Sequence, residues 1–179
     1  MAIHPSVAAL LRESVPEYLD IARYCCHTPK PGGGWYGYPA ALLLLTIIDV
    51  IGSYHWQDSA FTVNVDGRAQ SINDDASDHY LVLNSHYYGQ SLTRRQIDKL
   101  SEYFRCLLAH NASLAPGKLL DIGNPADPVF YFGGDGEIDV INLRGLLAVT
   151  EGAVQQFLAV ADTVGTGRRA KMIMRKAPP

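Results

Sequence analysis

The sequence predicts a mainly helical protein, a bundle of four or five helices with one small β-hairpin near residues 129–141. Apolar residues recur at helical spacing in several long segments, and two of these segments open with a capping-box pattern. The run "PAALLLLTIIDVIG" is apolar nearly all round, which is typical of a central helix. β-prone residues gather around the glycine-rich turn of "VFYFGGDGEIDVINL", which favours the hairpin.

Length and charge favour a single domain. A chain of 179 residues has the size of one domain, and its formal net charge is −3. The five basic and no acidic residues of 168–179 leave −8 for residues 1–167. We therefore expect one domain over residues 1–167 and a basic, disordered tail over residues 168–179. An acidic body gives no general electrostatic attraction for nucleic acid.

The first helix is predicted over "ESVPEYLDIARYCCH", with Ser14 and Glu17 as its capping box. The segment "TPKPGGG" ends this helix. Residues 32–37, "GGGWYG", share these glycines and match the G-x-G-x-x-G spacing, but a dinucleotide fingerprint follows a strand, and here a helix precedes. We expect a helix-to-helix loop, and loop 32–38 either closes over a site or packs against the helices.

The central helix is expected from about Pro39 to Trp56. A polar stretch over residues 57–76 follows, either a long loop or a loop containing a short hairpin around the turn signal Asp66–Gly67. A short helix, capped by Ser77 or Asp78, is predicted next over "SDHYLVLNSHYYG".

The clearest helix is "SLTRRQIDKLSEYFRCLLAHN", in which Thr93 and Gln96 form a second capping box and Asn111 is a plausible end. Residues 113–128 are expected to be a loop before the hairpin. Asn142 is expected to cap the last helix, which runs through "LRGLLAVTEGAVQQFLAVAD".

No metal or cofactor is predicted. None of the three cysteines makes a pair with metal-ligand spacing, and such free cysteines suit a reducing cytosol. The first residues lack the pattern of a signal peptide. The most apolar run has about a dozen apolar residues, whereas a membrane span needs about 20. These observations predict a cytoplasmic protein that does not bind a membrane.

Asp49 and Arg105 are candidate partners. Asp49 lies in the middle of "LLLLTIIDVIG", where a buried carboxylate needs a compensating partner. Asp49 either turns to solvent, bonds a backbone group, or pairs with a cation of another helix, for which Arg105 is the candidate. Within its own helix, Arg105 can instead pair with Glu102 one turn back.

Arg105 and His110 point about 140° apart on an ideal helix, so they do not share a face. As a cation near a helix end, His110 suits the helix dipole.

The segments "LLLLTIIDVIGS" and "LSEYFRCLLAHN", with an Arg-x4-His motif near the end of an inner helix, resemble the HEPN superfamily (higher eukaryotes and prokaryotes nucleotide-binding). The resemblance covers roughly residues 36–113, and in outline residues 14–162. It implies a homodimer in which Arg105 and His110 of both chains line one cleft and cleave RNA without a metal. Asp49, Glu102, Cys106 and Asn111 would support them. A toxin or antiphage role is implied, with an antitoxin or nucleotidyltransferase as partner.

Cys106 departs from the family pattern, because active ribonucleases commonly have Asn, Asp or His after the arginine. A thiol is a weak hydrogen-bond partner. The alternative is therefore a non-catalytic HEPN-like dimer that binds a protein or a nucleotide. The low charge and the aromatic residues of "GGGWYGY" and "SHYYG" also favour this alternative.

Overall fold

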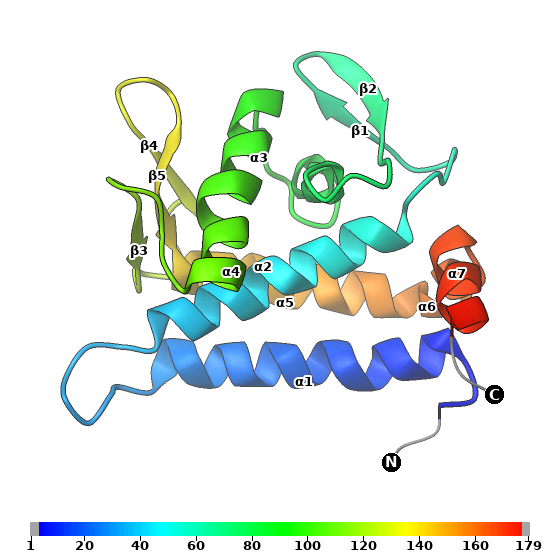
Figure 1. Cartoon of the computed structure of the whole chain (residues 1–179), viewed down its shortest axis with the longest axis horizontal. Coiled ribbons are helices and arrows are strands. Elements are labelled where there is room, and N and C mark those ends of the chain that lie inside the picture. The colour runs from blue at the N-terminus through cyan, green and yellow to red at the C-terminus, as the bar shows by residue number, and fades with distance from the viewer. Residues whose placement is uncertain (1–3, 177–179) are drawn as a thin grey trace.

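The protein is mainly helical, as a computed structural model that describes residues 4–176 shows (Figure 1). Its three long helices, α1 (Val7–His27), α2 (Gly37–Tyr54) and α5 (Leu143–Ala159), all pack against one another. Two small sheets and a broken helix lie on the side of α2 that faces away from α1. More helical segments are present than the four or five expected, because several of them are short.

Helix α1 begins two turns before the predicted start. Ser6 is its N-cap, and the Ser6 hydroxyl accepts a hydrogen bond from the Ala9 N–H at 3.1 Å. The Ser14 hydroxyl donates to the Leu10 carbonyl at 2.9 Å, so Ser14 is inside the helix. The prediction of a cap at Ser14 was wrong because the buried stripe continues toward the N-terminus through Leu11 and Val7.

Helix α2 is the central helix, as predicted, and its bounds lie within two residues of the expected ones. Its buried positions form one broad face, and most of them are fully inaccessible. The half-buried positions on the other side are Leu42, Leu43, Thr46, Asp49 and Val50. Helix α2 is long and apolar enough to cross a membrane, judged by length and composition alone. A mostly buried core helix of a soluble protein has the same length and composition.

The polar stretch 57–76 contains the short hairpin. Strands β1 (Thr62–Val65) and β2 (Arg68–Ser71) pair antiparallel. Asp66 and Gly67 both have positive φ, as a two-residue turn of this hand requires. The following helix, η1 (Asp78–Asn84), is a 3-10 helix in which Ser77 provides no side-chain cap.

The predicted helix before Asn111 is continuous but contains a π-helical turn. It consists of α3 (Arg94–Leu100), the π segment η2 (Ser101–Cys106) and α4 (Leu107–Asn111). Thr93 and Gln96 form the predicted capping box. Ala112, in a left-handed conformation with φ of 50°, ends the helix after Asn111.

The second sheet has three strands instead of two, in the order β3-β5-β4. The predicted hairpin is formed by β4 (Phe130–Phe132) and β5 (Ile138–Asn142). β3 (Leu119–Asp121) pairs parallel to β5, although the sequence predicted only a loop over residues 113–128. Three residues are too few to show strand periodicity, so this pairing is visible only in the fold.

Asn142 caps α5 as predicted, and its Oδ1 accepts from the Gly145 N–H at 3.0 Å. The last predicted helix is divided, because α5 ends at Ala159 and α6 (Ala161–Val164) follows.

The basic segment forms helix α7 (Arg168–Lys176) instead of the expected disordered tail. Ala170 is buried, and the Arg168 guanidinium lies 5.2 Å from the centre of the Trp56 ring. These contacts with the helical core oppose the entropy that would leave a charged segment disordered. The part of the predicted tail at residues 177–179 lies outside the described residues.

His55 is buried in an aromatic cluster. Its ring stacks on Phe61 with 3.8 Å between ring centres, and its Nε2 lies 3.1 Å from the Tyr87 hydroxyl. Burial lowers the pKa of His55 below its usual 6.5, and the opposing effect of Asp58, 3.6 Å away, does not compensate.

This burial predicts a loss of stability in weak acid. Below about pH 6.5 the unfolded chain protonates residue 55 more readily than the folded protein does, because the pKa of His55 is lower in the folded state. We expect the free energy of unfolding to fall from pH 7 to pH 5, by up to about 1.4 kcal/mol per pH unit. Urea denaturation at several pH values measures this slope. His55→Phe should reduce it, whereas the exposed His27, changed to alanine, should leave it unchanged; an equal slope in His55→Phe would contradict the assignment.

Candidate functional site

Asp49 is the charged residue of α2, and its side chain is 20% exposed. The carboxylate accepts a hydrogen bond from Arg105 Nη2 at 3.0 Å through Oδ2. Its other oxygen, Oδ1, lies 2.6 Å from Nδ1 of His79. Of the arrangements considered for Asp49, the ion pair with Arg105 is therefore the one observed. We call Asp49, His79 and Arg105 the Asp49 cluster.

Glycine at position 52 lets η1 approach α2 closely enough to bring His79 to Asp49. A Cβ atom on Gly52 would lie 2.0 Å from the backbone oxygen of His79. Gly52 is three residues after Asp49, so both lie on the face of α2 that η1 covers. The buried Tyr80 of η1 also keeps η1 against α2, because its hydroxyl donates to the Leu45 carbonyl of α2 at 2.9 Å.

Arg105 reaches Asp49 from the π-helical turn. Arg105 is the fifth of the six residues of this π segment, η2. Glu102 pairs with Lys99, three positions before it, at 2.8 Å, and Arg105 pairs with Asp49 of α2. The Glu102–Arg105 pair considered from the sequence is not formed. Cys106 is a half-buried free thiol at the end of this turn.

Asp49 is ionised at neutral pH. Burial alone would raise the pKa of Asp49, but the hydrogen bonds and charges of His79 and Arg105 outweigh burial and lower it. The carboxylate therefore compensates the charge of Arg105, whose side chain is 28% exposed. Asp49 engages one Nη of the guanidinium, and the Cys106 side chain also interacts with Arg105.

His79 was not among the residues predicted for the site. Its Nδ1 faces the ionised Asp49, which assigns the ring proton to Nδ1 in the neutral imidazole. Its Nε2 is buried without a hydrogen-bond partner among the described residues. No spacing in the sequence links position 79 to position 49, so only the packing of η1 on α2 identifies it.

His110 and Asn111 lie at the exposed end of α4. Neither makes a side-chain hydrogen bond or ion pair with the described residues, so His110 is not part of the Asp49 cluster. The site thus has two parts, a half-buried cluster with Arg105 at its edge and an exposed histidine beyond it on the same helix.

In residues 4–176, no group of three or more His, Cys, Asp or Glu side chains is placed to hold a metal ion.

Comparisons with protein-family models, with curated proteins and with solved structures gave no match.

Proposed function

We propose that this protein is a HEPN-like helical bundle that forms a homodimer and cleaves RNA without a metal, through Arg105 and His110. The observation that carries the proposal is that the Arg105 guanidinium is held in place and partly exposed. Asp49 restrains its guanidinium through one Nη, while part of the side chain remains exposed. A guanidinium carries five N–H groups, so a restrained Arg105 can still bind a phosphate bidentately.

The half-buried Asp49 cluster itself supports a functional role. Placing a carboxylate and a guanidinium against an apolar helix costs desolvation energy that apolar side chains would avoid. Such clusters are candidates for functional sites because they hold charged groups in one orientation. Asp49 is a positioning residue in this proposal, and His79 restrains its second oxygen.

His110 supplies the acid–base chemistry. In one protomer an unprotonated His110 takes the proton of the 2′-hydroxyl, whose oxygen attacks the adjacent phosphorus. The partner's His110, protonated, gives its proton to the departing 5′-oxygen, so the products are a 2′,3′-cyclic phosphate and a 5′-hydroxyl. Arg105 stabilises the charge that develops on the phosphoryl oxygens. Two histidines are needed, and the dimer provides the second one.

Cleavage of a mixed RNA in EDTA tests this function. We expect His110→Ala to reduce the cleavage rate by at least about a hundredfold, because a general acid–base group is lost. His27→Ala is the matched control, since His27 is also an exposed histidine in the last turn of a helix. Circular dichroism checks the fold of both variants. Full activity in His110→Ala, or no cleavage by the wild-type protein, would contradict the proposal.

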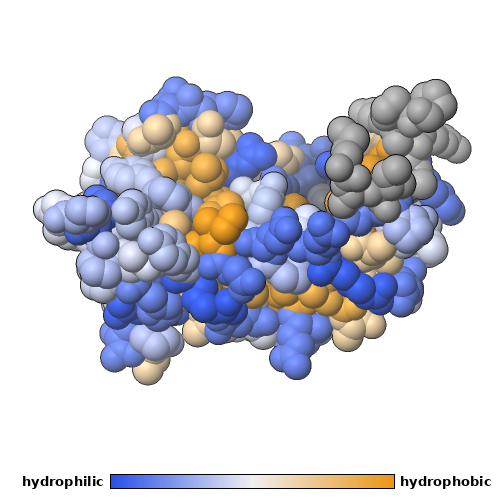
Figure 2. Space-filling model, turned by 90° about the horizontal axis from the view of Figure 1, so that it is seen from below, coloured by the Kyte–Doolittle hydropathy of each residue, from blue (hydrophilic) through white to orange (hydrophobic). Residues whose placement is uncertain are grey.

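The second candidate function is a HEPN-like dimer that binds a protein partner or a nucleotide and does not cleave RNA. It is supported by three exposed side chains at helical spacing on α1, since Tyr18 is 41%, Ile21 51% and Tyr24 60% exposed. Figure 2 views the molecule from the α1 side, where hydrophobic residues reach the surface between hydrophilic ones. Light scattering that finds a dimer, together with an absence of cleavage, would favour this function; a monomer would count against both.

A further inference from the structure

A cavity of about 280 Å³ lies where the glycine-rich loop, the start of α2 and strand β3 meet. Five aliphatic side chains form its apolar lining: Leu114, Leu119, Leu120, Ile122 and Leu143. Trp35 and Tyr38 add aromatic rings, and Tyr38 is 52% exposed at the edge of the cavity. An apolar cavity with aromatic walls is suited to a flat organic ligand.

The glycine-rich loop places a lysine beside this cavity. Pro29 and Trp35 form an isolated β-bridge, and the Lys30 N–H donates to the Gly34 carbonyl at 2.9 Å. Gly33 and Gly34 both have positive φ, which glycine adopts without strain. The Lys30 side chain lies across this turn, because a Cβ on Gly34 would be 3.6 Å from Lys30 Cε.

The charge of the lining is positive. No lining residue is acidic, although the whole chain carries a net charge of −3. Lys30 forms no ion pair with any carboxylate of the described residues. Lys118, by contrast, forms an ion pair with Asp139 at 2.9 Å. Its aliphatic stem lines the cavity, and its charge is compensated by that carboxylate.

Two further features add positive potential. The Arg144 guanidinium lies 5.0 Å from the centre of the Trp35 ring. Helix α2 begins at the cavity with no acidic residue in its first turn, and its N-cap, Tyr36, makes no side-chain hydrogen bond. The positive end of the α2 dipole is therefore not compensated by a side chain of the helix itself.

We propose that this cavity binds a small planar aromatic anion, with its ring among Trp35, Tyr38 and the aliphatic lining and its anionic group at Lys30. Both a mononucleotide and an aromatic carboxylic acid have this chemistry. The site is independent of the proposed RNA cleavage, because neither Arg105 nor His110 lines the cavity.

Titration calorimetry on the full chain tests the site with two pairs of probes. AMP is compared with adenosine, and indole-3-acetate with indole-3-acetamide, so each pair differs in the anionic group. We expect one of the two anions to bind about tenfold more tightly than its uncharged analogue, because the charge adds one charge-assisted contact. Tighter binding of AMP identifies the ligand as a mononucleotide, and tighter binding of indole-3-acetate identifies it as an aromatic carboxylic acid. Failure of both anions to bind at millimolar concentration would overturn the proposal.

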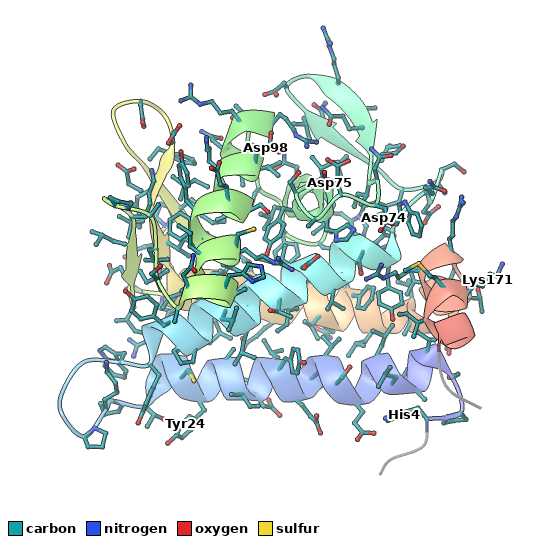
Figure 3. The ribbon with its side chains drawn as sticks, in the orientation of Figure 1. His4, Tyr24, Asp74, Asp75, Asp98 and Lys171 are labelled. Atoms are coloured by element: carbon teal, nitrogen blue, oxygen red, sulfur yellow. The ribbon has the colours of Figure 1, made fainter. Side chains whose placement is uncertain are left out.

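Variants locate the binding. Lys30→Gln should remove the tenfold preference for the anion, and Tyr38→Ala should weaken both members of the pair by about tenfold through loss of a ring contact. Lys171→Gln and Tyr131→Ala are the matched controls, because both residues are exposed and neither lines the cavity. Figure 3 shows Lys171 on α7, at the opposite end of the molecule from Tyr24 and the adjoining glycine-rich loop. Unchanged affinities in Lys30→Gln and Tyr38→Ala would overturn the assignment.

Discussion

Replacing Gly52 with alanine is expected to destabilise the protein by about 3 kcal/mol, because the new Cβ meets backbone in a packed interior. The added atom would lie 2.0 Å from the backbone oxygen of His79, and backbone cannot rotate away as a side chain can. Helix η1 must therefore move from α2, which also separates His79 from Asp49. Urea denaturation measures the loss, and a lower melting temperature by roughly 10 °C should accompany it.

Gly152→Ala is the matched control. Gly152 also lies within a helix, α5, but a Cβ there would meet no atom within 4 Å. Alanine is the better helix former, so this variant should gain about 0.5–1 kcal/mol. A nuclear magnetic resonance signal from the His79 Nδ1 proton should weaken in Gly52→Ala and persist in Gly152→Ala. Equal stability of the two variants would show that η1 does not depend on the glycine.

Replacing Asp49 with alanine is expected to cost about 3 kcal/mol of stability, since it leaves Arg105 half-buried without its counter-charge. The side chain of Asp49 is 20% exposed, so water entering the site offsets part of the loss expected for a fully buried pair. Arg105→Ala should cost less in the Asp49→Ala background than in the wild-type protein, because the guanidinium then lacks its acceptor. A double-mutant cycle measured by urea denaturation gives this coupling energy.

Asp162→Ala provides the surface comparison. Asp162 binds Arg12 through both guanidinium Nη atoms, at 3.0 and 2.7 Å, but its side chain is 79% exposed. Water and salt screen this pair, so its loss should have a much smaller effect than the loss of Asp49. Equal effects of Asp49→Ala and Asp162→Ala would mean that the Asp49 cluster contributes no more to stability than a surface ion pair.

Ion-pair formation also sets the pH range in which the Asp49 cluster stabilises the fold. The pKa of Asp49 is lower in the folded protein than in the unfolded chain, so the folded state holds the ionised form more strongly. This stabilisation is complete above the unfolded pKa of about 3.9 and is lost as the pH falls through the lower, folded value. It is therefore separate from the loss attributed to His55, which begins near pH 6.5.

Local chemistry explains which elements could be predicted. The capping box of Thr93 and Gln96, the cap at Asn142 and the turn at Asp66–Gly67 depend on contacts within a few residues, and all three were predicted. The start of α1 was missed because Ser6 and Ser14 are both suited to cap a helix. Burial of Val7 and Leu11 against the core extends the helix back to Ser6. Helix α7 and strand β3 were missed for a related reason, because distant segments stabilise both of them.

The sequence by itself determined the mainly helical class, the central position of α2, the turn and cap residues, and the candidates Asp49, Arg105 and His110. The class, the position of α2 and the turn and cap residues depend on periodicity and on local hydrogen bonds, which act between near neighbours of the chain. Arg105 and His110 are candidates because of the resemblance to the HEPN superfamily. Only the tertiary structure decided that Arg105 binds Asp49 and not Glu102, that His79 joins them, and that the glycine-rich loop borders a positively lined cavity. Each of these results from contacts between segments far apart in the chain, such as the close approach of η1 to α2 at Gly52.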